Sequence, residues 1–142
     1  MSLFSALSVS ASGMAAQRAR AELLVENLAN AETTRTPEGG PYRRKDVVFE
    51  SVPAEPGFQS LLEEAQGGGV AVSDVLTDAR DPERRYMPGH PDADANGYVA
   101  FPRMNPAEDM VDLMSAARGY DANVAAISAV KDMIVRSIGL LS

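Results

Sequence analysis

Apolar residues recur at alternating spacings of four and three along the first thirty residues of the chain. They form a heptad-like seam, interrupted only by Ser10 and Gln17, which predicts one long helix. Ser2 can cap its start, and it should end near Asn30, because the Thr-Thr-Arg-Thr-Pro run that follows disfavours helix. The N-terminal seam consists of Leu3, Leu7, Ser10, Met14, Gln17, Ala21, Leu24, Leu28 and Ala31.

A second apolar seam runs along the C-terminal end of the chain, and it begins with clear helix signals. Asn105 suits the N-cap, Pro106 the first helical position, and Glu108 the third position of a capping box. Lys131 interrupts the seam, and a three-residue step near Tyr120 would overwind a coiled coil locally. The C-terminal seam consists of Ala107, Met110, Met114, Ala117, Tyr120, Val124, Ile127, Lys131, Ile134, Ile138 and Leu141.

The middle of the chain has a different character from its ends. Residues 36–104 hold eight of the nine prolines and eight of the eleven glycines, which excludes long helices there. Short runs of β-branched and aromatic residues instead predict strands, with the last two joined as a hairpin. The expected strands span 41–50, 70–77, 84–87 and 97–101.

The remaining segment, 51–69, is expected to be a flexible loop. Gly67 to Gly69 suit a hinge, and Leu61 and Leu62 a short helix. The sequence therefore predicts an α+β fold in which long terminal helices pack as a coiled coil around a small β-rich, irregular middle region. The expected parts are an N-terminal helix within 1–34, the β-rich middle at 35–104 and a C-terminal helix within 105–142.

The two seams need more cover than the middle region can provide. A helix of about 29 residues is ~43 Å long, and each large apolar side chain left in water forfeits roughly 1.5–3 kcal/mol. The seams must therefore pair with each other, with other copies or with partners. Two interpretations follow with equal weight: a subunit whose terminal helices fold fully on assembly, or an antiparallel helical hairpin that closes on itself.

Composition excludes several classes of protein. The net charge of −7 and the pI near 4.6 argue against a nucleic-acid binder, because phosphate contacts need basic surface. The chain contains no cysteine, so disulfide and thiol chemistry are absent. No apolar run reaches the length that spans a bilayer. A cleaved signal peptide is not expected, because the first basic residue is Arg18 and no positive n-region precedes it.

The stretch DADANG at 92–97 matches the first half of an EF-hand calcium loop, with Asp92, Asp94 and Asn96 as candidate ligands. The twelfth position of such a loop needs a glutamate, whereas this chain has Arg103 there. A polar turn is therefore the better interpretation, and a calcium-binding module is the competing one.

His90 is the only histidine, and it lies between glycine and proline in an expected loop. A solvated turn explains it better than a weak metal site or an enzyme that uses His90. No enzyme motif and no cofactor motif is present, so neither an activity nor a cofactor is expected.

Two longer blocks resemble a known family. NLANAETTRTPEGGPYRRKDVVF, at 27–49, resembles the N-terminal motif of bacterial flagellar rod and hook proteins. PGHPDADANGYVAFPRMNPAEDMVDLMSAARGYDANV, at 88–124, closely resembles the proximal rod members of that family rather than its other rod proteins. Ala117 departs from the family, which often has serine there, and 51–69 matches no family pattern.

The resemblance implies a structural subunit of the flagellar basal-body rod, which is required for flagellum assembly and motility. Such subunits stack helically; their terminal helices form an inner coiled-coil tube around the export channel, with the β-rich middle outside. The rod crosses the periplasm, and the flagellar type III export apparatus exports its subunits without a cleaved signal. Implied partners are other copies, proximal and distal rod proteins, adaptor components between the MS ring and the rod, and the export apparatus, with no nucleic acid or small-molecule substrate.

The seams and the family motifs together give an expected assembly interface. Asn27 and Asn30, at the end of the first helix, are expected to hydrogen-bond the backbone of neighbouring segments, as buried amides must. A charge at Leu28 or Ile134 is expected to abolish motility, because it would be buried unpaired at a subunit contact. The expected interface consists of Leu3, Leu7, Met14, Leu24, Asn27, Leu28, Asn30, Tyr42, Met110, Met114, Tyr120, Asn123, Val124, Ile127, Ile134, Ile138 and Leu141.

Overall fold

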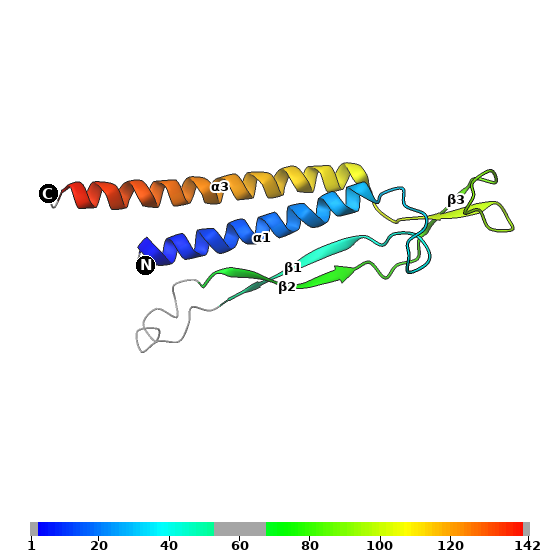
Figure 1. Cartoon of the computed structure of the whole chain (residues 1–142), viewed down its shortest axis with the longest axis horizontal. Helices are drawn as coiled ribbons and strands as arrows, with labels where there is room; N and C mark the ends of the chain where they lie inside the picture. The colour runs from blue at the N-terminus through cyan, green and yellow to red at the C-terminus, as the bar shows by residue number, and fades with distance from the viewer. Residues whose placement is uncertain (1–2, 53–67, 141–142) are drawn as a thin grey trace.

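The computed structural model describes residues 3–52 and 68–140. Two long helices, α1 (Leu3–Ala29) and α3 (Pro106–Gly139), lie side by side and antiparallel, so that both chain ends lie at the same end of the molecule (Figure 1). Both predicted helices are confirmed, and in this structure they pair with each other. Neither helix of the described part is long and apolar enough to cross a membrane. The proposed cap at Ser2 and the short helix at Leu61 and Leu62 lie outside the described residues.

The start of α3 follows the sequence closely. Asn105 is the N-cap, and its Oδ1 accepts a hydrogen bond from the backbone N–H of Ala107 at 3.1 Å. Glu108 reaches back as in a capping box, but its Oε1 accepts from the Asn105 side-chain amide at 3.0 Å rather than from a backbone N–H. Glu108 and Asp109 lie in the first turn, where negative charge favours the helix dipole.

Two antiparallel strands, β1 (Lys45–Ser51) and β2 (Val70–Thr77), form a ribbon in which Lys45 pairs with Thr77 and Ser51 with Val70. The register shifts between Val48 and Phe49, which is a β-bulge. The prediction of β2 is correct, but β1 begins at Lys45 instead of residue 41. The reason is Tyr42, whose N–H bonds to the carbonyl of Thr33 and whose side chain is buried, which holds 41–44 out of the ladder.

The predicted hairpin is confirmed as β3 (Glu83–Tyr86) and β4 (Tyr98–Phe101). It extends beyond the end of the helices that is opposite the chain ends (Figure 1). The rings of Tyr86 and Tyr98 meet edge to face with centroids 5.3 Å apart, and Val99 is fully buried. Gly97 closes the preceding turn with a φ of 80°, a conformation that favours glycine.

The two helices and the β1–β2 ribbon form three layers, with α1 between α3 on one side and the ribbon on the other (Figure 1). The ribbon approaches α1 closely at Gly69: a Cβ there would lie 2.5 Å from Ser12 Oγ, and that hydroxyl accepts from the N–H of Val70. Gly69 also accepts from the N–H of Val52, which continues the ladder. Gly69 is therefore a packing position beside α1, while Gly67 of the predicted hinge lies outside the described residues.

The predicted seam of α3 differs from the face that packs on α1. Met110 and Met114 are 57% and 54% exposed, whereas the buried residues of this helix are Asp109, Ala116 and Val130. The contact face is thus rotated by about one residue from the apolar seam over the first half of the helix. Small and polar residues such as Ala116 and Asp109 allow α1 to come close on this face, and Met110 and Met114 face outward. The buried apolar residues of the described part are Ala16, Leu24, Tyr42, Val99, Phe101, Ala116 and Val130.

Because the core is small, a substitution at one buried position tests how α1 packs against its neighbours. Leu24→Ala should lower the free energy of unfolding by about 2–5 kcal/mol, because Leu24 is buried and its truncation leaves a cavity. Val25→Ala, at the adjacent and half-exposed position, should change it by about 0.5 kcal/mol or less. Urea unfolding followed by helical circular dichroism measures both, and equal losses would contradict the orientation of α1.

Candidate assembly interface

The expected interface residues fall into three groups by their exposure to solvent, apart from Leu141, which lies outside the described part. Six are exposed: Leu3, Met110, Met114, Tyr120, Val124 and Ile138. Seven are partly exposed: Leu7, Met14, Leu28, Asn30, Asn123, Ile127 and Ile134. Three are buried within the chain: Leu24, Asn27 and Tyr42.

Exposed apolar side chains gather at the start of α3. Met110, Val111 and Met114, which we call the α3 ridge, lie on adjacent positions of the first two turns and are all more than half exposed. Single exposed apolar residues are ordinary on protein surfaces, but neighbouring ones on one helix face mark contact sites. The ridge is thus a surface suited to another apolar partner.

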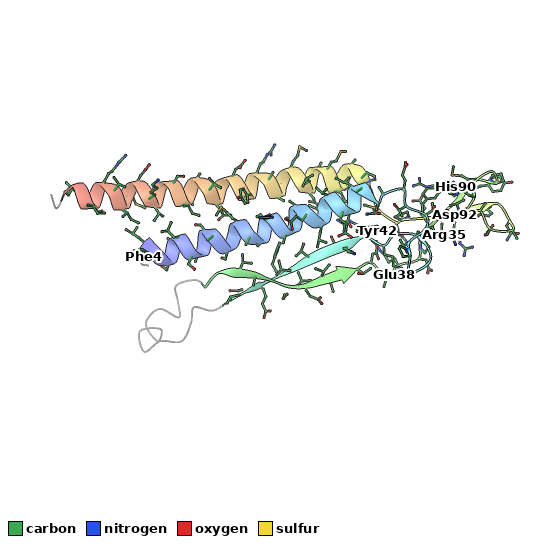
Figure 2. All side chains as sticks on the ribbon, in the orientation of Figure 1. Phe4, Arg35, Glu38, Tyr42, His90 and Asp92 are labelled. Carbon is green, nitrogen blue, oxygen red and sulfur yellow. The ribbon has the colours of Figure 1, made fainter. Side chains whose placement is uncertain are left out.

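The seam pattern missed several of the most exposed apolar residues. They lie one position away from seam residues, so a strict heptad leaves them out although they widen the same stripe. Phe4 lies at the N-terminal end of α1 (Figure 2). The missed residues are Phe4, Val111, Val135 and Leu140.

Asn27 is fully buried although it is polar. Its Nδ2 donates to the carbonyl of Lys45 at 2.8 Å, and its Oδ1 accepts from the backbone N–H of Lys45 at 3.0 Å. The same Oδ1 accepts from the hydroxyl of Tyr42 at 2.9 Å. The expected bond to a neighbouring backbone segment therefore exists within the chain, where it joins α1 to the first residue of β1.

Tyr42 is held as a hydrogen-bond donor by its surroundings. Burial, and then the nearby carboxylate of Glu26, raise the pKa of Tyr42 to about 12, so the hydroxyl stays protonated. Lys45 places its ammonium 2.6 Å from Glu26 and 5.8 Å from the centre of the Tyr42 ring. Lys45 therefore adds an ion pair and a cation–π contact beside the buried Tyr42 side chain.

Arg44, just before β1, connects this segment to α3. Its Nη2 donates to Asp109 Oδ1 at 2.8 Å and its Nε to the same oxygen at 3.1 Å, and its guanidinium also contacts Asp46. The hydrogen bond with Asp109 is the main cause that raises the pKa of Arg44. Because the side chains of Asp109 and Arg44 are 1% and 21% exposed, the ion pair is largely buried, and removing Arg44 would leave the carboxylate of Asp109 buried without its partner.

Asn30 has a more local role than Asn27. Its Nδ2 donates to the carbonyl of Glu26 at 2.9 Å, and its Oδ1 accepts from the hydroxyl of Thr33 at 3.1 Å. These bonds satisfy groups at the C-terminal end of α1. Asn27 and Asn30 therefore have different roles: Asn27 joins α1 to β1, and Asn30 caps the end of α1.

The DADANG loop forms a polar turn. Asp94 Oδ1 accepts from the backbone N–H groups of Asn96 and Tyr98, and these bonds lower the pKa of Asp94. Asp92 instead accepts from the hydroxyl of Thr34 at 2.8 Å, which ties the loop to the segment after α1. Within residues 3–52 and 68–140, no group of three histidine or acidic side chains is arranged to hold a metal ion.

His90 lies beside the same loop, near Asp92 and Arg35 (Figure 2). Its Nδ1 accepts from the backbone N–H of Asp92 at 3.1 Å, and its ring meets Phe101 edge to face with centroids 6.3 Å apart. The histidine therefore packs and caps a turn.

Comparison with known proteins identifies the family. A family model described as the C-terminal part of flagellar basal-body rod FlgEFG proteins matches residues 95–140. A FlgC rod protein of Bacillus subtilis is 41% identical over 97% of both chains. FlgC rod proteins of Salmonella typhimurium and Borreliella burgdorferi are 39% and 37% identical over 99% of this chain and 98% and 99% of theirs.

The chain belongs to the FlgC family of flagellar basal-body rod proteins. The resemblance inferred from the two sequence blocks is thereby confirmed, and the chain is a structural subunit of the rod rather than an enzyme. As an FlgC protein it is located in the flagellar basal body and assembles with other components of that structure.

The two asparagines of this FlgC protein provide a matched comparison. Asn27→Leu should lower the free energy of unfolding by about 3 kcal/mol or more, because it leaves several buried polar groups of Tyr42 and Lys45 without partners. Asn30→Leu should cost about 1 kcal/mol, because its bonds are local and partly exposed. Urea unfolding measures both, and equal losses at the two positions would contradict the assigned roles.

Proposed function

We propose that this chain is a subunit of the proximal rod, and that it assembles through the exposed apolar faces of α1 and α3. The α3 ridge is the main support for this proposal, because its side chains face outward and are more than half exposed to solvent. Burying such side chains contributes roughly 1.5–3 kcal/mol each. Assembly would therefore supply the burial that the single chain lacks.

The heptad-like spacing supports a coiled-coil arrangement of these helices in the assembled rod. In this proposal, 1–34 and 105–142 form the inner layer around the export channel, and 35–104 forms the outer layer. The three-layer arrangement supports it, because the ribbon covers one side of α1 and leaves much of α3 bare. The interface includes the exposed members of the expected set, with Asn27 and Tyr42 supporting it from inside the chain.

Torque would pass between subunits through these packed helices. The proposed neighbours are other copies, proximal and distal rod proteins, and adaptor components between the MS ring and the rod. The chain would reach the periplasm through the flagellar type III export apparatus without a cleaved signal peptide.

A charge on the α3 ridge tests the interface. Met114→Asp, introduced at the chromosomal locus, should abolish swimming and remove the subunit from purified basal bodies. An unpaired charge buried at each contact costs about 3 kcal/mol, which weakens the contact roughly 150-fold. Leu28→Asp and Ile134→Asp should have the same effect on swimming.

Two controls separate loss of assembly from loss of fold. Met114→Leu keeps the apolar surface and should swim normally. Purified Met114→Asp should unfold at the same urea concentration as the unaltered chain, because Met114 is 54% exposed within it. Normal swimming of Met114→Asp would contradict the proposed interface.

A further inference from the structure

Two glycines lie where α1 and α3 touch, and each faces an amide side chain of the opposite helix. A Cβ added at Gly13 would lie 2.9 Å from Asn123 Oδ1. A Cβ added at Gly119 would lie 3.1 Å from the Gln17 side-chain amide carbon. Both separations are shorter than ordinary van der Waals contact, so each amide occupies the space that a side chain would fill.

The two contacts are reciprocal. Gly13 and Gln17 are four residues apart on α1, and Gly119 and Asn123 are four apart on α3, so each helix offers one glycine and one amide on the same face. Because the helices are antiparallel, Gly13 meets Asn123 and Gln17 meets Gly119. Asn123 Nδ2 also donates to the carbonyl of Gly119 at 2.9 Å, which fixes the orientation of that amide.

Gln17 destabilises the fold at this position. Its Oε1 is buried and, among residues 3–52 and 68–140, has no hydrogen-bond partner. A buried carbonyl without a partner destabilises a fold, and a methionine of similar length would fill the space without that cost. Buried polar residues in helix interfaces are best known for fixing register rather than for adding stability.

The positions of the glycines and amides also disfavour the nearest alternative alignments of α3 along α1. Sliding α3 by one turn in one direction would place Gln17 opposite Asn123, so that two amides collide. Sliding it by one turn in the other direction would place Gly13 opposite Gly119, which leaves a gap. Of these alignments, the observed register alone matches each amide with a glycine.

We propose that these two glycine–amide pairs form a register lock, which fixes the alignment and rotation of α3 on α1 and so determines that the α3 ridge faces outward. Asn123, expected at first to contact other subunits, is then a positioning residue inside the chain. The inference concerns the isolated chain and does not depend on how the rod assembles.

Alanine substitutions test the close contacts on the purified full chain by urea unfolding. Gly13→Ala and Gly119→Ala should each unfold at lower urea concentration than the unaltered chain, although alanine favours helix over glycine. Gly139→Ala is the matched control, because a Cβ there meets nothing within 4 Å, and it should unfold at equal or higher concentration. Three variants that behave alike would overturn the proposal, as would an unaltered chain without cooperative helical unfolding.

Compensating substitutions show whether the pairs are specific. Asn123→Ala should restore stability to Gly13→Ala, and Gln17→Ala should restore it to Gly119→Ala. The crossed combination of Gly13→Ala with Gln17→Ala should show no restoration, because those residues belong to different pairs. Equal restoration in matched and crossed combinations would overturn the assignment.

Register itself can be measured, since the chain has no cysteine to interfere with labelling. Spin labels on Ser8→Cys and Ala117→Cys, two exposed positions offset along the helix axis, should give one distance in the otherwise unaltered chain. Adding Gln17→Met and Asn123→Leu should keep the helices folded but add a second population, because a slip of one turn moves α3 by about 6 Å. A single unchanged distance in that variant would overturn the lock.

Discussion

The segment Tyr42 to Lys45 holds the three layers together, and the fully buried amide of Asn27 is its anchor. Asn27 bonds to both backbone groups of Lys45 and to the Tyr42 hydroxyl, which attaches the ribbon to the end of α1. The intervening Arg44 forms a buried ion pair with Asp109 at the start of α3. Residues at and just before the start of β1 therefore fix both helices, and each bond involves a buried group, Asn27 or Asp109, whose loss of a partner destabilises the fold.

This anchoring explains how so little buried apolar surface can position two long helices. Between α1 and α3, small side chains, glycines and amides let the helices approach closely, while the α3 ridge and other bulky apolar residues remain outside. The exposed apolar residues at the start of α3 suit a rod subunit, because contact with other subunits would bury them.

The sequence predicted the features that depend on local chemistry. Asn105 and Pro106 located the start of α3, and Gly97 the turn before β4, because caps and turns depend on neighbouring residues. The α+β class and the two helices follow from periodicity, whereas the coiled coil of the assembled helices stays a prediction.

Long-range partners could not be predicted in the same way. The bonds from Asn27 to Lys45 and from Arg44 to Asp109 join residues 18 and 65 positions apart. The rotation of α3 about its own axis could not be predicted for a related reason. Hydrophobic periodicity finds an apolar face, but it does not say whether that face packs within the chain or between chains.

In the proposed rod, the α3 ridge contacts other subunits, whereas the buried side of α3 contacts only its own chain. Photo-cross-linking in intact basal bodies tests it most directly, with a photoreactive residue at Met114 in one strain and at buried Val130 in another. We expect cross-links between subunits from position 114 and cross-links only within the chain from position 130. Cross-links between subunits from position 130, with none from position 114, would contradict it.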